Sequence, residues 1–335
     1  MLIVRLSSLG DVLFAFPAVQ ALLDSGRATR VAWLVEDRAA ALLALLPGLD
    51  EVLVFPRRRR SAWPAHAVRL LARRDDLVLD LQGNLKSRAQ LLFLRSRCTA
   101  GFDASVARER AHLAYDRAIS PQGSRHRVAQ GLAFMRALGV PAPLEPVRPR
   151  LRLPDAACAR ARELLARLPG SGPVVVLHPG TSAFGQLKRW APERFAELGD
   201  LLAARHGARL LLTGGPTESA LVQALRAGLR TPSLAPAPAG LPDLAALLQA
   251  AQLVVASDSL PLHLANALGT PVVGLYGPKD PAVTGPAFDR ARVVRGDAAC
   301  SPCTLRRCRD RICMDELPAA AVAAAAGELL AASAR

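Results

Sequence analysis

The chain has 335 residues, of which 51% are hydrophobic; this is more apolar material than one compact core usually holds, and it predicts two domains. The net charge of +15 favours anionic partners such as phosphates, acidic sugars or a membrane surface. Aromatic residues make up only 4% and no basic run is interleaved with them, which argues against binding of nucleic acid by base stacking.

No apolar run reaches the length of a transmembrane helix, so we expect no transmembrane segment. The apolar start of the chain is interrupted by Asp11, and Gly10-Asp11 is more typical of a turn that opens a helix than of a signal peptide. We therefore expect a cytoplasmic protein.

Short β-type runs alternate with helical stretches along the first half of the chain. The expected strands there are Leu2 to Leu6, Val31 to Val35, Val52 to Phe55 and Leu77 to Leu81. Alternation of this kind is typical of βαβ units that build a parallel sheet.

The second half repeats this scheme. Its expected strands are Val174 to Leu177, Arg209 to Thr213, Leu253 to Ala256 and Val272 to Tyr276. The expected helices between them are Glu193 to Arg205, Glu218 to Leu229, Leu244 to Gln252 and Leu262 to Leu268. An Ala-rich segment from Ala319 to Ala332 predicts a last helix packed on the body.

A proline-rich stretch separates the two halves. Five prolines between residues 141 and 154 predict an extended, stiff connection, and Gly170 to Pro173 precedes the next expected strand. We place the boundary near residue 153, which gives residues 1–153 and 154–335. Each half is predicted to be a Rossmann-like, doubly wound α/β domain, and the expected site is a cleft between the two.

Ligands of doubly wound sheets bind beyond the carboxyl ends of the strands, so the loops after the strands are examined first. In the first half, Asp11 can cap a helix or, as an ionised carboxylate, take a proton from an acceptor hydroxyl; its spacing alone favours the cap. Lys86 and Arg88 open a helix whose dipole opposes them, which favours an anionic ligand nearby. A basic run is either a solvated loop or a patch for phosphate or carboxylate groups, and consists of Arg57, Arg58, Arg59 and Arg60.

In the second half, Thr181 and Ser182 follow an expected strand and can hold phosphate oxygens. Lys188 adds a point charge where a diphosphate leaving group would develop negative charge. This pairing is suggestive and not specific. His178 is interpreted as a structural hydrogen-bonding residue and is given no catalytic role.

Two further loops of the second half have equally balanced interpretations. Glu218, after a glycine turn, can accept hydrogen bonds from ribose hydroxyls or cap a helix. Asp258, Ser259 and His263 run from a strand into a helix whose free N–H groups form an anion site, with a plain N-cap as the alternative.

Taken in this order, the motifs resemble those of the heptosyltransferase family, glycosyltransferases of the two-domain GT-B type that build the inner core of lipopolysaccharide. The likeness spans most of the chain. It rests on Ser7 to Asp11, Asp80 to Gly83 with Lys86-Ser87, His178 to Gly180, Lys188 to Trp190, Asp258-Ser259 with His263, Gly269 to Val273, and Gly277-Pro278.

The resemblance implies an inverting transfer in which Asp11 is the catalytic base and Lys188 neutralises the diphosphate. It implies a nucleotide-sugar site that consists of Thr181, Ser182, Glu218, Asp258, Ser259 and His263. It also implies a donor of the ADP-heptose type and no cofactor or catalytic metal. The implied acceptor is an anionic glycolipid at the inner face of the inner membrane, carrying phosphates or Kdo carboxylates, which would explain the basic first domain.

One departure from the family keeps the identity of the donor open. Leu260 stands where the family commonly has glycine, and its side chain occupies space that a glycine would leave for close approach of a ligand. A different nucleotide-sugar donor is therefore an alternative. A nucleotide-sugar epimerase of similar plan, and a basic protein that binds nucleic acid or membrane surfaces, are the alternative function classes.

A cysteine cluster with the spacing C-x2-C-x4-C-x4-C lies near the C-terminus and consists of Cys300, Cys303, Cys308 and Cys313. Four thiolates so spaced could hold structural zinc, but the spacing lacks the paired pattern of strong zinc motifs. In a reducing cytoplasm, free or occasionally paired thiols are favoured. Cys98 and Cys158 are expected to be isolated core residues.

Overall fold

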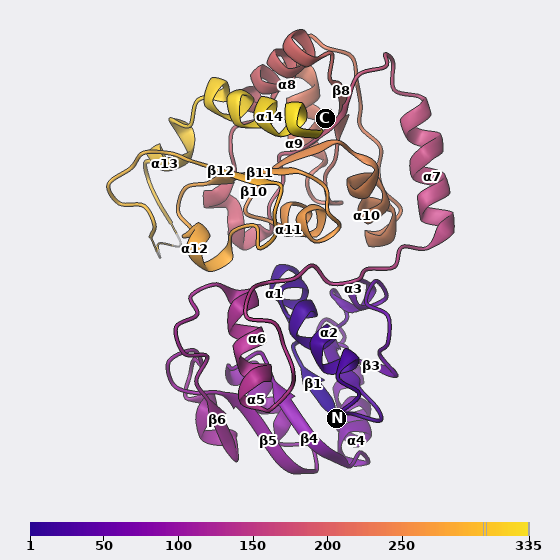
Figure 1. The fold of residues 1–335 in the computed structure, drawn as a ribbon, viewed down its shortest axis with the longest axis vertical. Coiled ribbons are helices and arrows are strands. Elements are labelled where there is room, and N and C mark those ends of the chain that lie inside the picture. Colours follow the sequence, from indigo (N-terminus) through magenta and orange to yellow (C-terminus); the bar gives the residue numbers. More distant parts are fainter. Residues whose placement is uncertain (304, 306, 334–335) are drawn as a thin grey trace. The chain divides into compact units, whose positions relative to one another are not determined.

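The computed structural model describes residues 1–303, 305 and 307–333 of the chain. It consists of two compact units, Met1–Arg152 and Leu153–Arg335 (Figure 1). The division falls one residue before the sequence-based boundary, at the end of the proline-rich stretch.

Unit 1 is built on a six-stranded parallel sheet with the strand order β3-β2-β1-β4-β5-β6. The strands are β1 (Leu2–Val4), β2 (Ala32–Glu36), β3 (Glu51–Phe55), β4 (Asp75–Asp80), β5 (Ser96–Phe102) and β6 (Arg117–Ile119). The helices are α1 (Leu9–Phe14), α2 (Phe16–Asp24), α3 (Ala40–Leu43), α4 (Trp63–Leu71), α5 (Leu85–Leu91) and α6 (Arg127–Ala137), with short 3₁₀ turns at Arg60–Ala62 and Ala111–Ala114.

Unit 2 repeats this topology with the order β12-β11-β10-β7-β8-β9. The strands are β7 (Val174–His178), β8 (Arg209–Leu212), β9 (Ser233–Leu234), β10 (Leu253–Ser257), β11 (Val272–Tyr276) and β12 (Ala291–Arg295). The helices are α7 (Asp155–Ala166), the 3₁₀ helix η3 (Ala183–Lys188), α8 (Pro192–His206), α9 (Ser219–Gly228), α10 (Leu241–Ala250), α11 (Leu260–Ala267), α12 (Pro281–Thr284), α13 (Ile312–Asp315) and α14 (Ala319–Ser333).

Both sheets therefore have a point where the strand order reverses, between β1 and β4 in unit 1 and between β7 and β10 in unit 2. The carboxyl ends of such neighbouring strands diverge into loops that leave a crevice, which is where doubly wound sheets bind ligands. Most of the predicted site residues lie in the loops after β1, β4, β7 and β10 or in the helices that directly follow these loops. The fold class predicted from the sequence, α/β with two doubly wound domains, is confirmed.

The central strands form the core of each unit because they are covered on both faces. Every residue of β1 and β7 is buried, which matches their uninterrupted apolar runs. In unit 2 the predicted Ala-rich helix is present as α14, and it packs Val322, Ala326 and Leu330 into the core that contains Trp190. No helix within the described residues is both long and apolar enough to cross a membrane.

Candidate active site

Asp11 occupies the third position of α1, directly after the loop that follows β1. The N–H and Oγ of Ser8 donate to its Oδ2 at 3.3 and 2.8 Å, and Nη2 of Arg5 lies 2.9 Å from its Oδ1. The side chain of Asp11 is nevertheless 32% exposed. It thus stabilises the start of the helix and still presents a carboxylate oxygen to a ligand, so the two interpretations of Asp11 are compatible.

The surroundings of Asp11 keep it ionised. Burial by itself raises the pKa of this carboxyl group, but the positive charges of Arg5 and Arg127 and the hydrogen bonds from Ser8 outweigh it and hold the pKa below the ordinary value of 3.8. At neutral pH the group is a carboxylate that can accept a proton from a hydroxyl.

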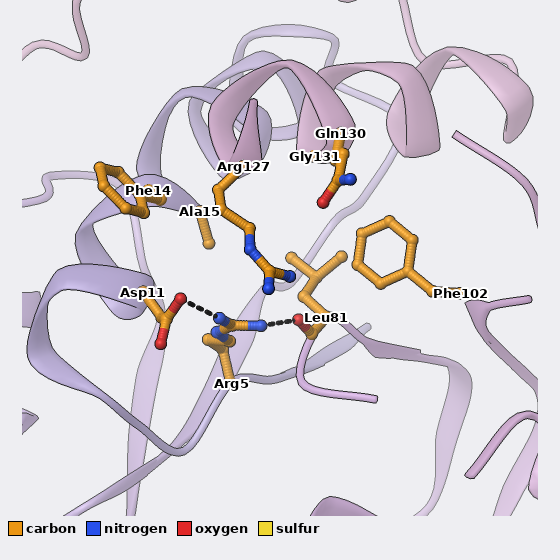
Figure 2. Close-up of a pocket in the computed structure, with 9 residues that line it drawn as sticks. All are labelled: Arg5, Asp11, Phe14, Ala15, Leu81, Phe102, Arg127, Gln130 and Gly131. Carbon is orange, nitrogen blue, oxygen red and sulfur yellow. Dashed lines mark hydrogen bonds and ion pairs between the residues drawn. The ribbon is translucent and has the colours of Figure 1, made fainter. Parts of the chain in front are cut away.

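A small pocket opens beside Asp11 (Figure 2). Its lining consists of Arg5, Asp11, Phe14, Ala15, Leu81, Phe102, Arg127, Gln130 and Gly131. Neither arginine was predicted from the sequence to belong to the site. Arg5 had a signal, because it is a charged residue at the end of an apolar central strand; Arg127 had none, because it lies in a basic stretch that looks like ordinary surface.

The loop after β4 fixes the loop after β1. Oε1 of Gln82 accepts hydrogen bonds from the N–H groups of Leu6 and Ser7, both at 3.1 Å. Asp80 is fully buried and accepts from the hydroxyl of Tyr115 at 2.8 Å and from the N–H of Gln82, also at 2.8 Å. This motif therefore positions the residues that precede Asp11.

Lys86, which was assigned to the acceptor, already has an anionic partner within the chain. Its Nζ lies 2.6 Å from Oε1 of Glu36 and donates to Oγ of Ser7 at 2.7 Å. Glu36 therefore already compensates the unfavourable position of this cation at the start of a helix, and Lys86 also contacts the loop that precedes Asp11. Arg88 is half-buried on α5.

The basic run after β3 is exposed throughout its four arginines. Nε of Arg57 lies 3.9 Å from Oε1 of Glu36, and its guanidinium lies 6.0 Å from the ring centroid of Trp63. The backbone N–H of Arg58 donates to Oδ2 of Asp37 at 3.4 Å. The side chains of Arg58, Arg59 and Arg60 therefore remain accessible to an anionic ligand.

In unit 2, Lys188 and His263 meet at Asp258. Nζ of Lys188 lies 3.0 Å from Oδ2 of Asp258 and donates to its main-chain oxygen at 2.5 Å. Nε2 of His263 lies 3.0 Å from Oδ1 of the same carboxylate. The structure thus brings together three residues that are 70 and 5 positions apart and that the sequence assigned to one site.

The charge of Asp258 contributes to stability in a pH-dependent way. Burial raises the pKa of this carboxyl group, but the hydrogen bond from His263 and the charge of Lys188 lower it to about 2. Because the folded pKa lies below the ordinary 3.8, the ionised group stabilises the fold above pH 4, and this contribution is lost as the pH falls toward 2.

We expect Asp258→Asn to cost about 2 kcal/mol of unfolding free energy at pH 7 and about half of that at pH 3. Denaturant unfolding of both proteins at the two pH values measures the difference. An equal difference at pH 7 and pH 3 would contradict the role of this ion pair.

Ser259 is the N-cap of α11 but does not cap it with its side chain. Its Oγ is buried and has no hydrogen-bond partner among the described residues. Buried hydroxyls without a partner are uncommon in folded proteins, and this one lies at a helix N-terminus, where an anion is favoured. Leu260 is the first residue of α11 and is half-buried beside it.

Glu218 is held under the loop after β7. Its Oε2 accepts from the N–H of Gly215 at 2.7 Å and lies 3.5 Å from Nε2 of His178. Nδ1 of His178 lies 3.0 Å from Oγ1 of Thr213, and burial lowers the pKa of His178 to about 4, so the ring is neutral at pH 7. These hydrogen bonds fit the structural role predicted for His178. Gly180 packs closely against Glu218, since a Cβ on Gly180 would lie only 2.0 Å from Oε2 of Glu218.

Thr181 and Ser182 differ in their environments. Thr181 is buried, its Oγ1 donates to the carbonyl of Gly185 at 2.9 Å, and Nε of Arg189 donates to it at 3.1 Å. Ser182 is exposed. The hydroxyl of Thr181 therefore shapes the loop after β7, and the hydroxyl of Ser182 is the more accessible of the two.

The segment that carries Lys188 is tied to the last part of the chain. The indole Nε1 of Trp190 donates to the carbonyl of Leu317 at 3.0 Å, and Trp190 is buried. Nη1 of Arg311 donates to the carbonyl of Arg189 at 3.2 Å. These contacts hold the residues directly after Lys188 against the region that leads into α14.

All four cysteines of the C-terminal cluster are free thiols. Cys300 is exposed and Cys313 is buried, and burial together with the neighbouring thiols raises the pKa of Cys313. Within the part of the chain that is described, no three His, Cys, Asp or Glu residues are arranged to hold a metal ion. Cys98 and Cys158 are half-buried and not core residues, contrary to the prediction.

Comparison with known proteins distinguishes the function classes that the sequence left open. Residues 63–312 match the model of glycosyltransferase family 9 (heptosyltransferase). The chain belongs to this family. The family 9 member is a glycosyltransferase, as predicted, and membership of this family argues against the epimerase and the non-enzymatic alternatives.

Several relatives match this family 9 member over most of its length. Lipopolysaccharide heptosyltransferase 1 of Pseudomonas aeruginosa is 32% identical over 325 residues, which cover 92% of this chain and 86% of the relative. The structure of Escherichia coli heptosyltransferase WaaC with ADP-2-deoxy-2-fluoro heptose is 28% identical, with a TM-score of 0.73 and 98% of both chains covered. The glycosyl transferase family 9 protein of Veillonella parvula has a TM-score of 0.84 at 21% identity, covers 99% of this chain and 97% of its own, and shows the likeness of the fold.

Proposed function

We propose that this protein transfers a heptose from an ADP-heptose-type donor to an anionic lipopolysaccharide inner-core acceptor, with inversion at the anomeric carbon. The observation that carries the proposal is the group formed by Lys188, Asp258 and the unpartnered hydroxyl of Ser259 at the start of α11, in a member of family 9. The named relative acts on lipopolysaccharide, and the E. coli structure contains an ADP-heptose analogue, which supports the donor and the acceptor classes.

The proposed reaction is a single displacement. Asp11 takes the proton of an acceptor hydroxyl while the hydroxyl oxygen forms a bond to the anomeric carbon of the donor. The bond from that carbon to the diphosphate breaks on the opposite side, which inverts the configuration. ADP leaves with the bonding electron pair, and Lys188 and the N–H groups at the start of α11 stabilise its developing charge.

The donor site of the proposal is made of residues that unit 2 already orders. Lys188 is held by Asp258 at 3.0 Å, so its ammonium group is positioned before a diphosphate arrives. We assign Glu218 to the ribose hydroxyls of the donor, and Ser182 and Ser259 to the phosphates of the donor. Thr181 contributes by holding its loop, since its hydroxyl is already hydrogen-bonded.

The acceptor site of the proposal lies in unit 1. The exposed guanidinium groups of Arg58, Arg59 and Arg60 are suited to phosphate or carboxylate groups of a glycolipid, and Arg57, Lys86 and Arg88 extend this basic surface. A basic surface is also attracted to anionic lipids. We therefore place the enzyme in the cytoplasm, peripherally on the inner face of the inner membrane.

Calorimetric titration with ADP, UDP, GDP and ADP-heptose, followed by a transfer assay with a lipopolysaccharide inner-core acceptor, tests the proposal. Preferential binding of ADP and ADP-heptose, with transfer of the heptose, is the expected result. A preference for UDP or GDP would change the donor, and Leu260→Gly is then the first variant to titrate. Absence of binding to all four would contradict the proposed donor site.

A further inference from the structure

The pocket beside Asp11 contains more positive than negative charge. Two guanidinium groups, those of Arg5 and Arg127, share it with a single carboxylate (Figure 2). Arg5 is already paired through both terminal nitrogens, because Nη2 lies 2.9 Å from Oδ1 of Asp11 and Nη1 donates to the carbonyl of Leu81, while its buried Nε has no hydrogen-bond partner among the described residues. The positive charge in excess is therefore that of Arg127.

Arg127 occupies a position that is unfavourable for a cation without an anionic partner. It is the first residue of α6, where the positive end of the helix dipole opposes a cation, and it is half-buried. Among the described residues it has neither a hydrogen-bond nor an ion-pair partner; the charge of Asp11 attracts it from a distance, while the charges of Arg5 and Arg108 repel it. Burial lowers the pKa of Arg127, but a guanidinium remains protonated in proteins. A half-buried cation under these conditions costs stability unless a ligand neutralises it.

We infer that Arg127 binds an acidic oxygen group of the acceptor, a carboxylate or a phosphate, next to the hydroxyl that Asp11 deprotonates. The planar guanidinium offers paired N–H donors to such a group. The remaining walls of the pocket are largely apolar, from Phe14, Leu81 and Phe102, and suit the C–H face of a sugar ring. This inference rests on the proposed function, and it gives the acceptor a fixed orientation in front of the base.

Binding of this kind would also change the strength of the base. The positive charges of Arg5 and Arg127 both lower the pKa of Asp11 in the free protein. An anion on Arg127 cancels part of this field, so Asp11 becomes a stronger base when the acceptor is bound. On the acid side, kcat should therefore begin to fall at a higher pH than kcat/KM of the acceptor. Arg127→Gln should remove this difference between the two pH profiles.

The decisive comparison uses Arg127→Gln, Arg127→Lys and, as a matched control, Arg117→Gln. Arg117 is an exposed arginine on β6 of the same unit and does not line the pocket. We expect Arg127→Gln to raise the acceptor KM by roughly 10- to 100-fold, the loss typical of a hydrogen bond between charged groups. Arg127→Lys should recover part of the loss, and Arg117→Gln should match the wild type. Calorimetric affinity for ADP should be the same in all four proteins, and circular dichroism melting checks their folding.

Two acceptor analogues identify the group that Arg127 binds. One has its sugar carboxylate converted to a primary amide, and the other has its phosphates removed. The analogue that lacks the partner of Arg127 should be used equally poorly by the wild type and by Arg127→Gln. The inference is wrong if the wild type transfers heptose and Arg127→Gln still has a higher acceptor KM than the wild type with both analogues. It is also wrong if the two proteins have the same KM for the intact acceptor. Absence of transfer by the wild type would instead count against the proposed function.

Discussion

Replacing Asp11 with asparagine is expected to lower kcat by roughly 10²- to 10⁴-fold, the contribution typical of a general base. The amide has the size of the carboxylate, so it preserves the packing of α1, but it cannot take a proton from the acceptor hydroxyl. ADP should bind with unchanged affinity, because the proposed nucleotide residues all lie in unit 2. Steady-state transfer kinetics and calorimetry measure the two effects separately.

The pH dependence gives a second test of Asp11. Because its pKa lies below 3.8, the wild-type rate attributable to this base should hold from neutral pH down to about pH 4 and decline only below it. The residual rate of Asp11→Asn should lack that acid limb. Asp76→Asn is the matched control, since Asp76 is an exposed carboxylate of the same unit with 83% of its side chain accessible. A rate of Asp11→Asn within threefold of the wild type would rule out the base.

The second large effect is expected for Lys188→Gln, which should lower kcat by roughly 10²- to 10³-fold, as loss of one preorganised electrostatic group does in other enzymes. The ammonium group is proposed to neutralise the diphosphate as the bond to the sugar breaks. Its loss also removes the cation that neutralises the carboxylate of Asp258, which keeps contacts with His263 and with the hydroxyl of Tyr276. ADP should therefore bind more weakly to this variant as well.

Two further variants separate these contributions of Lys188. Lys188→Arg keeps the charge in a bulkier, planar group and should recover part of kcat. Asp258→Asn removes the anion but leaves the ammonium, so its kcat should fall less than that of Lys188→Gln. If Lys188→Gln retains the wild-type kcat, the leaving group is stabilised by other residues.

The sequence predicted the central strands well because each consists of an uninterrupted apolar run. Val174 to Leu177 and Val272 to Tyr276 appear in the structure with ends that differ by no more than one residue. Strands β5 and β12 were not predicted, because β5 contains Ser, Arg and Gly, and β12 begins and ends near arginines. Whether such a segment forms a strand depends on its pairing with a neighbouring strand, and local composition does not reveal that pairing.

The candidate site was predictable to the extent that topology brings the loops together. The loops after β1 and β4 lie side by side because their strands are neighbours, and the same holds for β7 and β10. What could not be predicted is which side chains pair. Glu36 takes up the charge of Lys86 from 50 residues away, and Arg127 reaches the pocket of Asp11 because α6 packs against α1.

The hydrogen bond from Trp190 to Leu317 has a consequence for synthesis of the protein. Its two residues are 127 positions apart, so the Lys188 loop leaves the ribosome long before the segment that holds it. At ordinary bacterial speeds of translation the delay is roughly 6 to 25 s. Throughout that interval the nascent chain contains Asp11, the proposed base, but the loop of Lys188 lacks this hydrogen bond, so a chain interrupted before Leu317 is expected to be unable to consume donor sugar.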